Sequence, residues 1–109
     1  MRVALDARVS TQRQAQAQTV EQQIERLTCY AGQQGLDISL EHVFRDDGYS
    51  GASLRRPGLD RLRDRAADRS LDLVVITAPD RLARNYVHQV LLLEELQGHG
   101  CEVRFLDRP

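Results

Sequence analysis

Four short apolar runs alternate along this chain with three segments of helical periodicity, and this alternation limits the folds that the chain can adopt. The run at residues 71–77 (LDLVVIT) is the richest in β-branched side chains, which is typical of a strand buried on both faces. Short strands separated by helices form a mostly parallel sheet, because each helix carries the chain back to the start of the next strand. We therefore predict an α/β fold with three layers, in which helices flank a mostly parallel central sheet of four or slightly more strands.

Capping and turn residues set the boundaries of these segments. Strands are predicted at residues 2–7, 39–44, 71–77 and 101–106. Helices are predicted at residues 19–34, 57–68 and 85–97, with Thr19 opening the first, Pro57 in the first turn of the second, and Gly35 ending the first. Residues 45–51 are rich in turn formers, so we expect a mobile loop there.

Composition bounds the class of protein. The 109 residues, of which 41% are hydrophobic and 28% charged, suffice for one compact domain. No apolar run approaches the roughly 18 residues that cross a bilayer, and the N-terminus lacks the apolar core of a signal peptide, so we expect a soluble, cytoplasmic protein without a membrane partner. The formal net charge of -1 does not by itself favour DNA binding, although all 15 basic residues are arginine, which suits phosphate recognition.

The cysteines and histidines do not suggest a disulfide framework or a metal site. Cys29 and Cys101 lie far apart in apolar stretches, which we interpret as small buried thiols. His42, His88 and His99 are scattered, and no Cys/His cluster has the spacing of a zinc ligand set.

Polar side chains suited to phosphate chemistry follow two of the predicted strands. Those after the first strand are Arg8, Ser10 and Thr11, and those after the third are Asp80, Arg81 and Arg84. The carboxyl ends of parallel strands meet at one edge of a sheet, so we expect both groups to share a site there. Fixed cations around a hydroxyl nucleophile suit phosphoryl transfer, because they stabilise charge on the non-bridging oxygens.

Taken singly, these residues have simpler interpretations. A serine after a strand is more often a turn or cap residue, and Asp80 could be a helix cap. Arg81 and Arg84 could form a solvated first turn, and Gln23 could be an exposed helical residue. No histidine near Ser10 follows a triad-like pattern, which argues against acyl transfer.

Five motifs occur in order along almost the whole chain. They are ARVST at residues 7–11, TVEQQ at 19–23, DGYSG at 47–51, RPGL at 56–59 and DRLARN at 80–85. Together with VRFL at 103–106, they resemble the catalytic domain of the serine site-specific DNA recombinases of the resolvase/invertase type. The resemblance implies a resolvase-like fold and an enzyme that cleaves and rejoins DNA.

The resemblance also implies a mechanism. Ser10 would attack a DNA phosphodiester, leaving a 5′ phosphoserine link and a free 3′ hydroxyl, so that bond energy is kept for religation after strand exchange. The arginines that match those around the scissile phosphate are Arg8, Arg56, Arg81 and Arg84. Gln23 and Asp80 match the polar residues that support it. The family uses no metal ion or other cofactor, so none is expected.

Two of these matches depend on position within a motif. Arg55 adjoins Arg56, and the spacing to Pro57 favours Arg56. Gln22 adjoins Gln23, and Gln23 occupies the last place of its motif. A helix presents only one of two adjacent residues to the site.

Asp6 departs from the family pattern, which has an aromatic residue, commonly tyrosine, before the ARVS sequence. A carboxylate here could pair with Arg8 and compete with DNA phosphate, or it could point elsewhere. Two alternatives stay open at this point. One is a partner-binding module with a spoiled site, and the other is a flavodoxin-like or nucleotide-binding α/β domain, although the chain has neither G-x-x-x-x-G-K-[ST] nor G-x-G-x-x-G after its first strand.

By resemblance, a dimerisation helix and a DNA-binding domain belong to the complete protein. We therefore expect residues 1–109 to be a truncated catalytic domain, inactive by itself, from a bacterial, phage or mobile-element protein. The complete protein would act as a dimer or tetramer on a double-stranded DNA recombination site. The spacing between Gln23 and residues 47–51 slightly favours the large phage-integrase type over a small resolvase or invertase, and a transposon-encoded recombinase also stays open.

Overall fold

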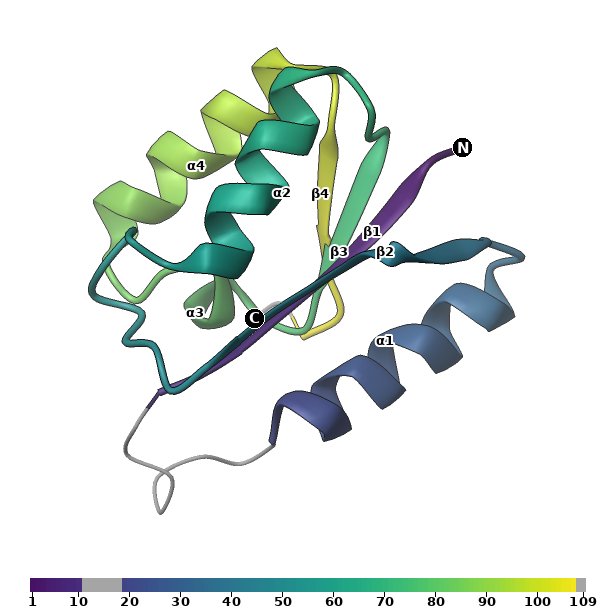
Figure 1. Ribbon diagram of the computed structural model, residues 1–109, viewed down its shortest axis with the longest axis horizontal. Coiled ribbons are helices and arrows are strands. Elements are labelled where there is room, and N and C mark those ends of the chain that lie inside the picture. The colour runs from purple at the N-terminus through teal and green to yellow at the C-terminus, as the bar shows by residue number, and fades with distance from the viewer. Residues whose placement is uncertain (11–18, 108–109) are drawn as a thin grey trace.

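The computed structural model describes residues 1–10 and 19–107, and its four strands form one parallel sheet. The strands are β1 (Val3–Val9), β2 (Ile38–Asp47), β3 (Leu73–Ile76) and β4 (Glu102–Phe105). Their order in the sheet is β2-β1-β3-β4, so that β1 and β3 are central and every neighbouring pair is parallel (Figure 1). The predicted α/β architecture with a parallel four-stranded sheet is confirmed.

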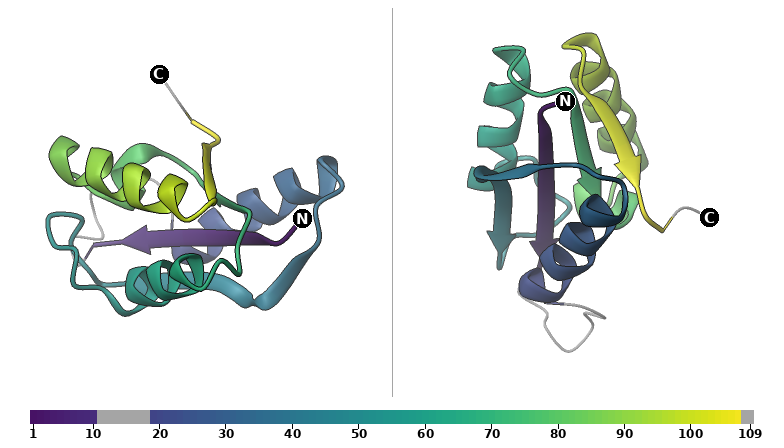
Figure 2. Two further views of the ribbon diagram at one scale, coloured as in Figure 1. Left: turned by 90° about the horizontal axis from the view of Figure 1, so that it is seen from above. Right: turned by 90° about the vertical axis from the view of Figure 1, so that its right-hand side faces the viewer.

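Helices cover both faces of this sheet. They are α1 (Val20–Gln33), α2 (Pro57–Ala67), α3 (Pro79–Leu82) and α4 (Tyr86–Gly98). The first lies on one face, and the other three lie on the opposite face (Figures 1 and 2). There α2 and α4 are joined by an ion pair in which the Arg63 guanidinium donates to both carboxylate oxygens of Glu95. The predicted three layers are therefore present.

The helix boundaries follow from local capping. Thr19 caps α1 through a reciprocal pair in which its hydroxyl accepts from the Gln22 N–H and the Gln22 side chain accepts from the Thr19 N–H. After α1 the chain turns at Gly35, whose φ of +69° lies in the left-handed region that favours glycine. The Asn85 side chain caps α4 by accepting from the backbone N–H of Val87.

Strand β1 separates two apolar clusters because its side chains alternate between the two faces of the sheet. Val3 and Leu5 pack with Leu27 of α1. Ala4 packs with residues of α2 and α4 on the other face, including Leu59. By the same alternation, the side chains of Asp6 and Arg8 belong to the face that carries α2, α3 and α4.

The structure corrects three details of the sequence predictions. Strand β2 continues to Asp47 instead of ending at Phe44, because Ala7–Val9 of β1 pair with residues 45–47. A short helix, α3, follows β3 and was not predicted. Cys29 is exposed, because the buried stripe of α1 passes through Leu27 and Ala31 and leaves Cys29 on the far side. Cys101 is buried, as predicted.

The part of the chain that the structure describes contains no helix that is both long enough and apolar enough to span a membrane.

Candidate active site

The side chain of Arg8 is held by backbone carbonyls at the carboxyl edge of the sheet. It lies near the end of β1 and only 2% of the residue is exposed. Its Nε donates to the carbonyl of Arg81 at 3.1 Å, Nη1 to the carbonyl of Tyr49 at 2.9 Å, and Nη2 to the carbonyl of Asp80 at 2.8 Å. This guanidinium therefore joins β1 to the loop after β2 and to α3.

Arg56 reaches the same turn of α3 from the residue before α2. Its Nη1 donates to the Arg81 carbonyl at 3.3 Å, and its Nη2 donates to the carbonyl of Leu82. Arg56 is 1% exposed, whereas Arg55 is exposed. Of the two adjacent arginines, the one that the motif spacing favoured is the one that lies at the site.

Asp46 completes this buried group, and the sequence analysis did not single it out. Its two carboxylate oxygens accept from the backbone N–H groups of Gly58 and Leu59 at 2.7 and 3.0 Å, and one oxygen lies 4.0 Å from the Arg56 Nε. A carboxylate on these N–H groups stabilises the start of α2. Its signal in the sequence was the two-residue spacing from Phe44, which places both side chains on one face of β2 once the strand is extended.

Gln23 holds the backbone of Arg8 from the opposite face of the sheet. Its Nε2 donates to the Arg8 carbonyl at 2.9 Å, and its Oε1 accepts from the Arg8 N–H at 3.2 Å. Gln23 is fully buried, while Gln22 takes part in the cap of α1. Of the two glutamines, Gln23 is therefore the one that contacts Arg8.

Ser10 and Arg81 lie at the same edge. Ser10 directly follows β1, two residues after Arg8, and is 8% exposed. Arg81 is half-buried on α3, and its Nη1 lies 3.5 Å from the Arg8 carbonyl. Arg8, which lies inside β1 and not after it, thus contacts Asp80 and Arg81 after β3, and Thr11 lies outside the described residues.

Asp80 and Arg84 lie at the exposed edge of this group of residues. Both are exposed, and it is the carbonyl of Asp80, instead of its carboxylate, that contacts Arg8. The backbone N–H of Arg84 donates to the Gly51 carbonyl at 2.9 Å. Gly51 lies so close to the arginines that a Cβ atom there would be 2.8 Å from Arg8 Nη2 and 2.5 Å from Arg84 Cγ, so a larger residue would have to displace these side chains.

Burial and mutual repulsion act on the arginines. The pKa of Arg8 falls to about 10, because burial disfavours the charge and Arg56 and Arg81 add like charges. Burial also lowers the pKa of Arg56, and the carboxylates of Asp6 and Asp46 oppose that change. Arg8 remains a cation at neutral pH, so the site holds a concentrated positive charge.

Asp6 lies beneath these arginines and is 1% exposed. Neither of its carboxylate oxygens has a hydrogen-bond partner within the described part of the chain. Burial raises its pKa to about 7, and among nearby charges Arg56 acts on it more strongly than Arg8. The open question of whether Asp6 pairs with Arg8 is therefore answered: the two side chains form no ion pair, and Arg56 is the more important neighbour.

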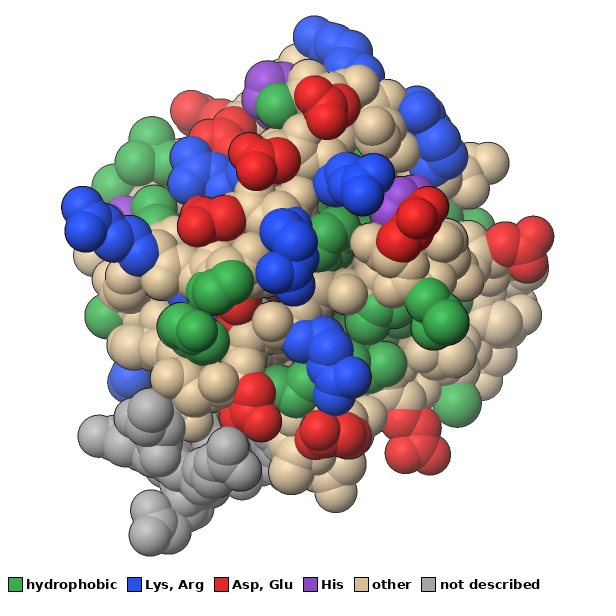
Figure 3. All heavy atoms as spheres, viewed as in Figure 1, with side chains coloured by type: hydrophobic (Ala, Val, Ile, Leu, Met, Phe, Trp, Pro, Cys, Tyr) green, Lys and Arg blue, Asp and Glu red, His purple; other side chains and the backbone are tan. Residues whose placement is uncertain are grey.

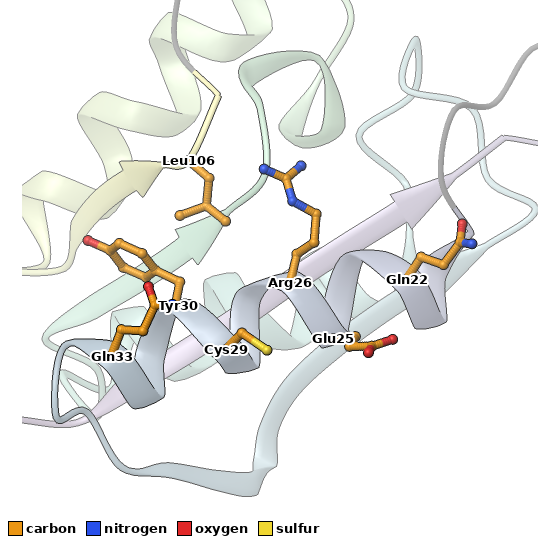
Figure 4. A pocket seen from close by; sticks show the side chains of 7 residues that line it. All are labelled: Gln22, Glu25, Arg26, Cys29, Tyr30, Gln33 and Leu106. Atoms are coloured by element: carbon orange, nitrogen blue, oxygen red, sulfur yellow. The ribbon is translucent and has the colours of Figure 1, made fainter.

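Two further features of the described residues concern metal and ligand binding. Among them, no group of three or more His, Cys, Asp or Glu side chains could hold a metal ion. A groove of about 650 Å³ lies on the α1 side of the sheet (Figure 4). Its lining residues are Gln22, Glu25, Arg26, Cys29, Tyr30, Gln33 and Leu106. On the face shown in Figure 3, arginine and acidic side chains are interspersed instead of forming one basic patch.

Curated proteins similar to this chain are DNA recombinases and resolvases. The chain is 33% identical over 106 residues to a putative DNA recombinase of Bacillus subtilis (strain 168), and 32% identical over 107 residues to the Tn3 transposon resolvase of Escherichia coli. These alignments cover 96% and 98% of this chain, but 20% and 51% of the two relatives. The chain thus spans about half the length of the resolvase and about a fifth of the length of the recombinase.

Solved structures with this fold are catalytic domains of the same kind. The N-terminal catalytic domain of TP901-1 integrase matches with a TM-score of 0.86 and 30% identity, over 97% of this chain and 77% of that one. The C-terminal catalytic domain of ISC1926 TnpA, an IS607-like serine recombinase, matches with a TM-score of 0.83 and 32% identity, over 97% and 70% of the two chains. The family described as "Resolvase, N terminal domain" matches residues 3–109. The sheet order, the similar solved structures and this match over nearly the whole chain agree, and the chain belongs to the resolvase N-terminal domain family.

Proposed function

We propose that this chain is the catalytic domain of a site-specific DNA recombinase that cleaves and rejoins double-stranded DNA through Ser10. One observation carries the proposal: at the carboxyl edge of the sheet, arginines from three separate segments meet at the end of β1, the strand that Ser10 directly follows. These are Arg8 of β1, Arg56 before α2 and Arg81 of α3. Such a cluster of cations next to a hydroxyl suits a reaction in which negative charge builds up on phosphate oxygens.

The reaction exchanges one phosphate ester for another. The Ser10 Oγ attacks the phosphorus and loses its proton, a bond forms between Oγ and phosphorus, and the bond to the 3′ oxygen breaks. The leaving 3′ oxygen takes up a proton, and the 5′ end stays attached to Ser10. In religation a 3′ hydroxyl attacks this phosphoserine and releases the serine, so the two steps conserve the number of phosphoester bonds.

The exposed and the buried arginines have different roles in this proposal. Arg81 is half-buried and Arg84 is exposed, so these two arginines are the ones that DNA phosphate reaches first. Arg8 and Arg56 are buried, and most of their contacts are to backbone carbonyls, so they fix the loops of the site and supply positive potential from below. Cations held in place before the substrate arrives need no reorganisation during the reaction, which is what makes them effective.

Gln23 and Asp80 are positioning residues in this proposal. Gln23 holds the peptide groups of Arg8 on both sides, and therefore the strand end that leads to Ser10. The Asp80 carbonyl orients the Arg8 guanidinium, and its carboxylate favours the charged form of Arg8. Neither is required to touch DNA.

Choice of a DNA site and self-association into dimers or tetramers belong, in this proposal, to the complete protein. The chain spans at most about half of its curated relatives, whose names are those of DNA recombinases and resolvases. The matches to integrase, resolvase and transposon proteins support the general reaction, and they leave the subtype open.

The test is cleavage of supercoiled DNA that carries the recombination site, by the complete protein with Ser10→Ala. We expect DNA binding to persist and cleavage to disappear, because the nucleophile has been removed. Ser39→Ala is the matched control, since Ser39 is an exposed serine on β2. Residual cleavage by Ser10→Ala would exclude Ser10 as the nucleophile, and loss of cleavage in both variants would point to a general defect. If the domain were a partner-binding module with a spoiled site, the unmodified protein would bind the DNA and leave it intact.

A further inference from the structure

Asp6 is a buried charged group that the proposed reaction does not use. It lies in the middle of β1, in register with Phe44 of β2 and Ile76 of β3, and both of its carboxylate oxygens lack a hydrogen-bond partner among the described residues. Buried carboxylates are normally hydrogen-bonded or paired, because removal from water penalises the charge. An unpartnered buried carboxylate that interacts electrostatically with Arg56 and Arg8 therefore calls for a functional explanation.

The charged groups around Asp6 are those of the proposed phosphate site. Arg56 acts on it most strongly, followed by Asp46 of β2 and Arg8 of β1. Strand β3 contributes no charge, since its residues are Leu73–Ile76 and all are apolar. Asp80 and Arg81 of α3 act on Arg8, and Asp60 of α2 acts on Arg56, so they influence Asp6 through those arginines.

The Nε of Arg56 is a buried donor that forms no hydrogen bond with the described residues. Its Nη1 and Nη2 bind the carbonyls of Arg81 and Leu82, but its Nε has no hydrogen-bond partner within the described residues and lies 4.0 Å from an Asp46 oxygen that already accepts from Leu59. Asp6 and Arg56 thus interact electrostatically, and the Asp6 oxygens and the Arg56 Nε are all buried without a hydrogen-bond partner among the described residues. The positive charge of Arg56 stabilises the ionised form of Asp6, and it would also stabilise an anion bound at the arginines.

A phosphodiester at the arginines would compete with Asp6 for this shared charge. An additional anion nearby disfavours the ionised carboxylate, and Asp6 has no hydrogen bonds that would hold its negative charge in place. We propose that Asp6 is a positioning residue that takes up one proton from solvent when a phosphodiester binds, and so leaves Arg56 and Arg8 to neutralise the phosphate. This inference rests on the proposed function, because it requires the arginine cluster to be a phosphate site.

Proton uptake makes binding depend on pH. Because burial raises the pKa of Asp6 to about 7, part of the protein carries the ionised form at neutral pH before DNA arrives. Between the pKa of the free protein and the higher pKa of the complex, the affinity for a phosphodiester falls by up to about tenfold for each unit of pH. Below the free pKa, Asp6 is already neutral and the dependence disappears.

The experiment uses the 109-residue chain and the dinucleotide d(TpT), whose phosphodiester does not titrate between about pH 5 and 9. NMR chemical shifts report binding as a function of pH, and the ¹³C shift of the Asp6 carboxyl group reports its protonation directly. Two variants accompany the unmodified chain: Asp6→Asn, which cannot ionise, and Asp37→Asn as a matched control at an exposed aspartate.

We expect the affinity of the unmodified chain and of Asp37→Asn for d(TpT) to fall about fivefold between pH 7 and 8, because Asp6 is already half ionised at pH 7, and that of Asp6→Asn to stay constant. At pH 7, addition of d(TpT) should move the Asp6 carboxyl resonance toward its protonated position. Binding with the same pH dependence in all three proteins, and an unmoved Asp6 resonance, would refute the role of Asp6 and leave the phosphate site intact. Absence of d(TpT) binding at every pH would overturn the phosphate site itself. If Asp6→Asn did not fold, the Asp6 resonance of the unmodified chain would decide.

Discussion

At the scale of single residues, the site is built from charged side chains that are almost completely buried. Asp6, Arg8, Asp46 and Arg56 are each 1% or 2% exposed. Three of them bind backbone groups, which lowers the cost of burial, whereas Asp6 has no such partner. Asp6 is therefore the residue whose charge costs the fold most.

This cost predicts an effect of pH on stability. In the folded protein the pKa of Asp6 is raised from 3.8 to about 7, so the folded state retains a proton that the unfolded state has lost. The contribution of neutral Asp6 to the stability of the folded state is fully present below pH 3.8 and is lost as the pH rises through about 7. Chemical denaturation should show that the difference in free energy of unfolding between Asp6→Asn and the unmodified chain grows by about 2–3 kcal/mol from pH 5 to pH 8, in favour of Asp6→Asn. A difference that stays constant with pH would show that Asp6 is ionised throughout this range.

At the scale of the elements, the N-terminus of α2 links the fold to the site. Arg56 and Pro57 lead into the helix, and the Asp46 carboxylate accepts from its first free N–H groups. The same carboxylate lies beside the Arg56 guanidinium. A single residue of β2 therefore orients both a helix and a site arginine.

Replacement of Asp46 should destabilise the fold more than replacement of an exposed aspartate. Asp46→Ala leaves two buried backbone donors without an acceptor and removes the carboxylate beside the Arg56 guanidinium, which should cost about 3 kcal/mol. Asp37→Ala, at an exposed position, should change stability by less than about 0.5 kcal/mol. Urea denaturation of both variants measures the difference, and equal midpoints would contradict the role assigned to Asp46.

The elements themselves were largely predictable, because periodicity and capping are local properties of the sequence. Thr19 and Asn85 open α1 and α4 as their side chains suggest, and β3 is the buried central strand that its β-branched residues indicate. The end of β2 was missed because aspartate and glycine are typical of turns, and only pairing with β1 reveals that Asp46 continues the strand. Tertiary pairing decided what local propensity could not.

At the scale of the whole molecule, the site exists only because the parallel sheet brings distant segments to one edge. Arg8 contacts carbonyls of residues 41, 72 and 73 positions further along the chain. Sequence reasoning could place Ser10, Arg8 and Arg81 together, since the rule for strand ends applies to all parallel sheets. It could not reveal that carbonyls hold Arg8, or that Asp46 and Asp6 lie below it, because these contacts depend on side-chain packing.

Replacement of the Arg81 side chain should affect the reaction most while leaving the fold intact. The side chain is half-buried. The contacts of Arg8 and Arg56 are to the Arg81 backbone carbonyl, which any residue would supply. In the complete protein, Arg81→Ala should lower the cleavage rate by at least about 100-fold, the usual effect of removing one fixed stabilising group. Arg61→Ala, at an exposed position on α2, is the control and should cleave normally. Rates measured at saturating protein separate this effect from weaker DNA binding. A similar rate for both variants would remove Arg81 from the site.

The central claim is that Ser10 becomes covalently attached to DNA, and the direct measurement is to identify that bond. The complete protein is quenched during reaction with supercoiled DNA that carries its site, then digested with nuclease and protease, and the peptides are analysed by mass spectrometry. The account predicts a phosphate on Ser10, joined to the 5′ end of the cleaved strand. Cleaved DNA with the phosphate on another residue, or with no protein attached, would contradict it.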